Sequence, residues 1–150
     1  MPEPTPERRL AAFLARYDPK VAARARMARR KLRGLLPGAV ELVYDNYNAL
    51  VIGFGPSEKT SEAAFSIALY PRWVTLFFLQ GVALKDPERV LVGAGKQVRR
   101  IVIEGPETLD QPAVRALIAQ AWKRAGAPPA AIRRCVVIKS ISAKQRPRRP

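Results

Sequence analysis

The first part of the chain places its apolar residues at the spacing of α-helices. Thr5 is followed by Pro6 and Glu7, a combination typical of the first turn of a helix, and Asp18 with Pro19 repeats this start signal. Apolar residues at helical spacing follow each signal: Leu10, Phe13, Leu14 and Tyr17 after the first, and Val21, Ala25, Ala28, Leu32 and Leu35 after the second. The sequence therefore predicts two helices, the second from residue 19 to about residue 35.

After a stop signal at Pro37 and Gly38, the pattern changes from helical to extended. Short apolar runs follow one another and are separated by tight turns or polar linkers: 40–44, 50–54, 64–70 and 73–79. Runs of this kind are typical of antiparallel strands. Helical spacing returns at 113–122, and a last extended run covers 132–141. We therefore expect an α+β fold, a single compact domain in which N-terminal and C-terminal helices flank an antiparallel sheet.

Charge separates the two ends of the chain from its middle. The 150 residues carry a net charge of +15, with an excess of +7 in residues 1–33, +1 in residues 34–132 and +7 in residues 133–150. We divide the chain into an N-terminal arm and helix (1–18), an α+β domain (19–141) and a basic tail (142–150) that we expect to be disordered. Two basic ends on a near-neutral core favour an anionic partner, either nucleic acid or an acidic membrane surface, although such an excess can also serve solubility alone.

Arginines on the second helix and in the tail are the candidates for nucleic-acid contacts. Like charges at close helical spacing repel one another, so a polyanion would relieve the repulsion. The alternative is a solvated face of an amphipathic helix. The residues that we expect to act as an electrostatic clamp, without reading bases, are Arg26, Arg29, Arg30, Arg33, Arg146, Arg148 and Arg149.

The inventory of reactive residues argues against catalysis. The chain has no histidine, so the usual near-neutral base is missing, and no pair of acids lies within an apolar run. Its one cysteine, Cys135, excludes an internal disulfide and is expected to be a small buried apolar residue. The sequence has no long apolar run, and we expect no signal peptide. We expect a non-catalytic cytoplasmic protein without a cofactor, a bound metal or a membrane span.

A basic glycine turn is the candidate site for a small anion. Gly93 and Gly95 let the backbone adopt positive φ angles and expose N–H groups, and Lys96, Arg99 and Arg100 follow at once. The pattern departs from a nucleotide-binding Walker loop, because valine and glutamine stand at positions 90 and 97 where that loop needs glycine and a hydroxyl residue. A structural turn is the alternative reading.

Two further expectations concern the surroundings of this turn. Val90, Leu91 and Val92 should anchor it in the core. Tyr44 and Trp73 should form apolar walls, in a cleft that Tyr47 and Tyr70 could extend, unless these aromatics simply pack in the sheet.

At these positions the chain resembles the YdhG-like domains of unknown function. The resemblance covers about residues 20–125. It includes the Tyr44 region and an alanine-rich helix that ends in Ala121 and Trp122. The residues between them that carry most of it are Leu79, Gly81, Leu84, Asp86, Pro87, Leu91, Gly93, Gly95, Lys96, Arg99 and Ile101. It implies a small α+β domain with helices beside an antiparallel sheet.

Some relatives in that family are described as frataxin-like iron chaperones, so the resemblance also implies a role in iron delivery. Iron needs clustered carboxylates or imidazoles, and here the acids are scattered over turns at Asp45, Glu58, Glu62, Asp86 and Glu88. We therefore rank binding of a small anionic ligand or acidic partner first, sequence-independent nucleic-acid binding second and iron delivery third.

Overall fold

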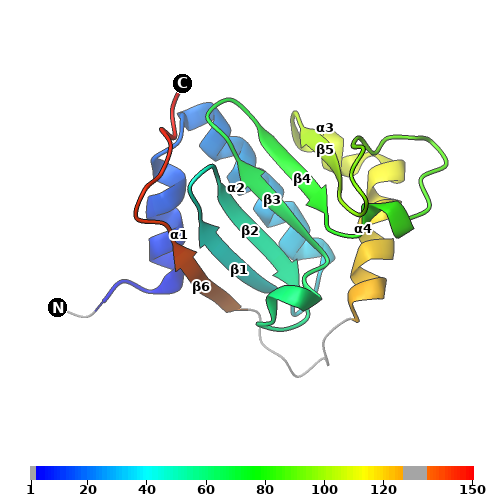
Figure 1. Cartoon of the computed structure of the whole chain (residues 1–150), viewed down its shortest axis with the longest axis horizontal. Helices are drawn as coiled ribbons and strands as arrows, with labels where there is room; N and C mark the ends of the chain where they lie inside the picture. Colours follow the sequence, from blue (N-terminus) through cyan, green and yellow to red (C-terminus); the bar gives the residue numbers. More distant parts are fainter. Residues whose placement is uncertain (1–2, 127–134) are drawn as a thin grey trace.

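The computed structural model describes residues 3–126 and 135–150, which form an α+β fold (Figure 1). The part of the last apolar run at 132–134 lies outside these residues. The helices and strands are α1 (Pro6–Ala15), α2 (Pro19–Leu35), β1 (Val40–Asp45), β2 (Leu50–Gly55), β3 (Phe65–Leu69), β4 (Val74–Phe78), β5 (Arg99–Ile103), α3 (Pro106–Asp110), α4 (Pro112–Ala125) and β6 (Cys135–Ile141). Two single 3₁₀ turns, Thr60–Glu62 and Gly81–Ala83, precede β3 and follow β4.

The strands form one mixed sheet in the order β5-β4-β3-β2-β1-β6. Strands β1 to β5 follow one another as an antiparallel meander, as predicted for the runs at 40–44, 50–54, 64–70 and 73–79. The edge strand β6 instead pairs in parallel with β1, with an irregularity in register after Val43. The fold class is therefore confirmed, and the parallel edge is a feature that the residue pattern did not specify.

The α-helices pack on one face of the sheet (Figure 1). Alternate strand residues point toward them and form the core with Leu10, Leu14 and the buried side of α2. At its centre the rings of Phe54 and Phe65 lie 5.6 Å apart, and those of Phe65 and Phe78 lie 5.9 Å apart. In the described residues no α-helix covers the opposite face, which we call the open face of the sheet.

The helix starts follow the local signals. The side chain of Thr5 accepts a hydrogen bond from the Arg8 amide, and that of Asp18 accepts one from the Lys20 amide. The short helix α3 was not predicted; Pro106 occupies its first turn. None of the helices in the described parts of the chain combines the length and apolarity needed to span a membrane.

Residues 142–150, expected to be a disordered tail, follow a defined path along α1 (Figure 1). The guanidinium of Arg148 is only 3% exposed and lies 2.9 Å from the carboxylate of Asp45, which is also buried. Gln145 binds the carbonyl of Asp45, and the Arg146 amide donates to the carbonyl of Tyr47. A buried ion pair thus fixes the segment, which charge composition could not reveal.

Candidate nucleic-acid interface

A group of aromatic and apolar side chains lies on the open face over β3, β4 and β5. Strand alternation places them there, because their sequence neighbours Leu69, Val74, Phe78 and Ile103 belong to the core on the helix side. We call this group the open-face platform. Its members are Tyr70, Trp73, Phe77 and Val102.

The platform is partly exposed to solvent. The side chains of Trp73 and Val102 are 48% and 45% exposed, and those of Tyr70 and Phe77 are half-buried. The rings of Tyr70 and Trp73 lie 5.9 Å apart with 38° between their planes. The Tyr70 amide donates to the Trp73 carbonyl at 2.9 Å across the hairpin turn, so the backbone holds the two rings together. The two rings therefore lie side by side at the turn that joins β3 to β4.

Small, buried residues lie beside the platform on the same face of the sheet. Gly53 and Ser66 lie in the same cross-strand row as Phe77, and Ala68 and Thr75 lie in the next row with Val102. A Cβ at Gly53 would lie in ordinary contact with Leu42 and Ala63. Because glycine has no side chain, the surface of the sheet is lower at this position of β2 than at Phe77. The aromatic rings consequently stand above their neighbours and can contact a flat ligand.

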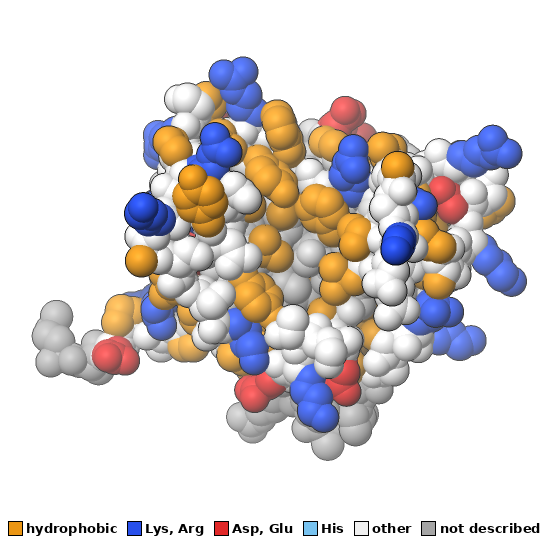
Figure 2. Space-filling view, viewed as in Figure 1, with side chains coloured by type: hydrophobic (Ala, Val, Ile, Leu, Met, Phe, Trp, Pro, Cys, Tyr) orange, Lys and Arg blue, Asp and Glu red, His pale blue; other side chains and the backbone are white. Residues whose placement is uncertain are grey.

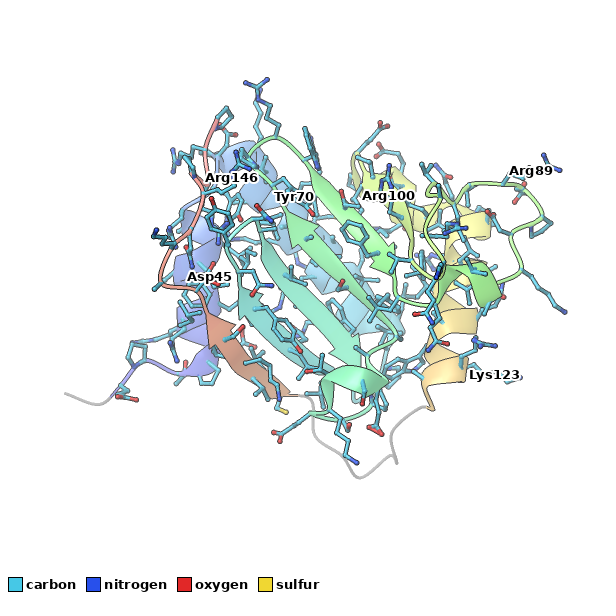
Figure 3. The ribbon with its side chains drawn as sticks, in the orientation of Figure 1. Asp45, Tyr70, Arg89, Arg100, Lys123 and Arg146 are labelled. Carbon is cyan, nitrogen blue, oxygen red and sulfur yellow. The ribbon has the colours of Figure 1, made fainter. Side chains whose placement is uncertain are left out.

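Cations lie at both ends of this surface. Arg100 is exposed and pairs with Phe77 in the register of β4 and β5, so it points to the open face. Figure 3 places Arg146 and Arg100 on opposite sides of Tyr70. In Figure 2, apolar side chains gather over the central strands, and lysine and arginine side chains lie around them. Glu104, which follows β5 and is exposed, is an acidic side chain at this edge.

Tyr44 lies on the open face but not beside the glycine turn. Its cross-strand row contains Val51, Ala68, Thr75 and Val102, so about three strand spacings of roughly 4.8 Å separate it from β4. Its hydroxyl also lies 2.6 Å from the hydroxyl of Thr60. Tyr44 and Trp73 thus share a face of the sheet without forming two walls of one pocket around the turn.

The glycine turn directs carbonyl groups toward Arg99. Gly93 has a φ of 143°, whereas Gly95 does not have a positive φ. The guanidinium of Arg99 donates to the carbonyls of Gly95 at 2.7 Å and Val98 at 2.8 Å. Arg99 therefore stabilises the turn by binding its carbonyl groups. Lys96 and Arg100 are the exposed cations of the predicted anion site.

The anchoring of this segment differs from the expectation at one residue. Val90 and Leu91 pack against the core, but Val92 is 54% exposed, and its expected core position is wrong. Val92 forms an isolated bridge with Arg100, which turns it away from the helices. Hydrogen bonds from the amides of Val90 and Leu91 to the carboxylate of Asp86, both 3.0 Å, hold the segment instead.

Substitution of Arg99 distinguishes the two cations of the turn. We expect Arg99→Ala to lower the free energy of unfolding by about 1–2 kcal/mol, because two carbonyls lose a charged donor. Lys96→Ala should change it by less than about 0.5 kcal/mol, since Lys96 is exposed. Urea denaturation of both variants measures the difference, and equal stabilities would contradict the role of Arg99 within the turn.

Several arginines of the predicted nucleic-acid clamp form ion pairs. Arg29 donates to the buried carboxylate of Glu41 at 2.5 Å and to Glu7 at 3.0 Å, and Arg33 pairs with the same two acids. Burial alone would lower the pKa of Arg29, but the hydrogen bond and charge of Glu41 outweigh it and raise that pKa. Arg26 and Arg30 on α2 are exposed, as are Arg146 and Arg149 in the tail.

The expected environment of Cys135 is wrong. Its side chain is exposed at the start of the edge strand β6, where it has no partner strand on its outer side. Partial desolvation, and then the charges of Glu58 and Glu41, raise the pKa of this thiol, which opposes thiolate formation. Within residues 3–126 and 135–150, no group of three His, Cys, Asp or Glu side chains is placed to hold a metal ion. The iron-delivery role stays a prediction.

Phe77 and Val102 were missing from the site predicted from the sequence. The run at 73–79 is apolar on both faces of its strand, because Trp73 and Phe77 alternate with core residues. Period-two alternation could have grouped Trp73 with Phe77. It could not show which of the two faces remains without a helix.

Comparisons with models of protein families, with curated proteins and with solved structures find no match. The resemblance to YdhG-like domains therefore stays a prediction.

Proposed function

We propose that the protein binds single-stranded nucleic acid, without sequence preference, on the open face of its sheet. The observation that carries the proposal is the open-face platform itself: the adjacent rings of Tyr70 and Trp73 at the turn between β3 and β4, Phe77 with Arg100 beside it, and no α-helix over them in the described residues. The net charge of +15 supplies the general attraction for a polyanion.

Each part of the platform matches a part of the ligand. Unpaired bases offer flat surfaces that stack on aromatic rings, and stacking tolerates any base because every base has a π-face. Arg100 and Arg146 lie where phosphates on either side of the stacked bases would pass. A duplex keeps its bases stacked inside and therefore cannot use the rings. The chemistry thus favours single strands over duplexes.

This arrangement differs from a clamp formed by the second helix and the tail. Arg148 is held in a buried ion pair with Asp45, and Arg29 and Arg33 share the carboxylate of Glu41, so these arginines offer a clamp less charge than their number suggests. The small-anion hypothesis for the glycine turn is favoured less, because the Gly95 and Val98 carbonyls face Arg99. Exposed rings on the sheet give the single-strand hypothesis a more specific chemical basis than either alternative.

Loss of the Trp73 ring should weaken single-strand binding. We expect Trp73→Ala to cost about 1–3 kcal/mol of binding free energy to a fluorescently labelled oligouridylate, because one stacked base loses its partner. Fluorescence anisotropy at a fixed salt concentration measures the dissociation constant. Trp73→Phe keeps a ring and should retain most of the affinity, and Arg100→Gln should reduce the slope of log K against log salt by about one.

Two results would overturn the proposal. One is equal binding by Trp73→Ala and the parent protein, and the other is equal affinity for a duplex of the same length. A direct readout is available in a Trp122→Phe background, because Trp73 is then the single tryptophan of the sequence. Its fluorescence should be quenched by the oligonucleotide if bases stack on it.

A further inference from the structure

An arginine-lined groove runs along the outer side of α2, on the side of the sheet opposite the open face. Four arginines at positions i, i+3, i+4 and i+7 line it together with Gly34, and it has a volume of about 470 Å³. We call it the α2 groove. From this arrangement we infer that the α2 groove binds a compact oligophosphate, such as a di- or triphosphate group. The four arginines are Arg26, Arg29, Arg30 and Arg33.

Buried and half-buried acids hold two of these arginines in place. Glu41 on β1 is fully buried and lies 2.5 Å from Nε of Arg29 and 3.0 Å from Nε of Arg33. Glu7, at the start of α1, lies 3.0 Å from Arg29. Because their positions are fixed before a ligand arrives, these guanidiniums lose less side-chain entropy on binding. Two carboxylates against four guanidiniums leave the groove with excess positive charge.

Gly34 is a separate indication that the groove takes a ligand. It is the next-to-last residue of α2, still in the helix, where glycine is less favourable than alanine, and its φ is not positive. A Cβ at this position would meet no atom within 4 Å, so packing in the fold gives no reason for glycine. The missing side chain leaves the floor of the groove open, which allows close approach of a ligand to the helix backbone.

The chemistry of the lining favours phosphoryl groups over a single carboxylate. The planar guanidinium presents paired N–H donors that match phosphate oxygens, and such charge-assisted bonds are among the stronger ones in proteins. From Arg26 to Arg33 the helix rises by about 10 Å. Cations spread over that length suit a short chain of phosphoryl groups better than one isolated anion.

Isothermal titration calorimetry with inorganic triphosphate tests the inference. We expect one site per chain that persists at high salt and loses affinity about tenfold or more in Arg26→Gln/Arg30→Gln. The matched control is Lys20→Gln/Arg24→Gln, which removes two charges from the same helix outside the groove lining. It should bind triphosphate within about threefold of the parent, because the lost charges act only at long range.

Gly34 provides a test in which stability and binding change in opposite directions. Gly34→Ala should raise the melting temperature by about 1–4 °C, since alanine is the better helix former. It should nevertheless weaken triphosphate binding, and Gly34→Leu should weaken it further by filling the groove. A thermal shift assay with and without triphosphate reads both effects.

The outcomes separate this site from the open-face platform. Equal loss of triphosphate affinity in the two charge-matched pairs would overturn the inference, as would unchanged binding in Gly34→Leu. A response to nucleic acid alone, with none to triphosphate, would also overturn it. Trp73→Ala should leave triphosphate binding unchanged, so failure of single-strand binding on the open face does not affect this result.

Discussion

Replacing Arg148 with methionine is expected to lower the free energy of unfolding by about 3–5 kcal/mol, because Asp45 would remain buried without its main counter-charge. The Arg148 guanidinium donates to the Asp45 carboxylate at 2.9 Å and to the Asn46 carbonyl at 2.6 Å. Arg16, the other cation near this carboxylate, lies 3.5 Å away and is half exposed. Chemical denaturation monitored by circular dichroism measures the loss.

Arg149→Met is the matched control for this substitution. Arg149 is exposed, and its guanidinium reaches only backbone carbonyls, at 3.2 Å and 3.5 Å. Its replacement should change stability by no more than about 0.5 kcal/mol. In Asp45→Asn/Arg148→Met both charges are absent, so this double variant should recover part of the stability lost in Arg148→Met. If Arg148→Met and Arg149→Met lose the same stability, the buried pair is not what fixes the C-terminal segment.

Removing the hydroxyl of Tyr17 is expected to lower stability by about 2–4 kcal/mol, because two buried backbone groups lose their partner. The Tyr17 hydroxyl donates to the Leu69 carbonyl at 2.9 Å and accepts from the Leu50 amide at 3.0 Å. It thereby links the segment between α1 and α2 to β2 and β3. Tyr17→Phe keeps the ring and its contact with the Arg148 guanidinium, which lies 5.7 Å from the ring centre. The loss of stability in this variant therefore measures the contribution of the hydroxyl group alone.

The same variant should change the response of the protein to alkaline pH. Burial raises the pKa of Tyr17 above its ordinary value of 10.0. The unfolded chain therefore releases this proton first, and the contribution of Tyr17 to stability is lost as pH rises from about 10 through the folded-state pKa. Tyr17→Phe should show a smaller loss over that range. A loss equal to that of the parent protein would contradict the assignment.

Helix starts and the order of strands were predictable because their signals are local. Thr5 and Asp18 cap helices where the sequence indicated, and turn residues between apolar runs divided the meander correctly. The partner and direction of β6 were not predictable, because they depend on how the finished sheet brings distant segments together. The burial of Glu41 and Asp45 was missed for the same reason: only the assembled fold places arginines against them.

The candidate site depended on tertiary information even more. Trp73 was singled out from the sequence, but Phe77 could be assigned to the same open face only once the helices were seen to cover the other face. Conversely, Arg148 was a candidate ligand-binding residue that the fold uses in a buried ion pair. The residue types indicated which side chains could stack on a base or bind an anion. The packing of the fold determined which of these side chains remained exposed.

The parallel pairing of β6 with β1 has a consequence for synthesis on the ribosome. Strand β1 emerges early, but its second neighbour in the sheet is formed by residues near the other end of the chain. Until those residues leave the ribosome, β1 presents unpaired N–H and C=O groups that can pair with another nascent chain. During that time the carboxylate of Asp45 also lacks its ion pair with Arg148. Glu41 and Asp45, two acids on the helix side of β1, disfavour pairing of β1 with another chain before the last strand forms.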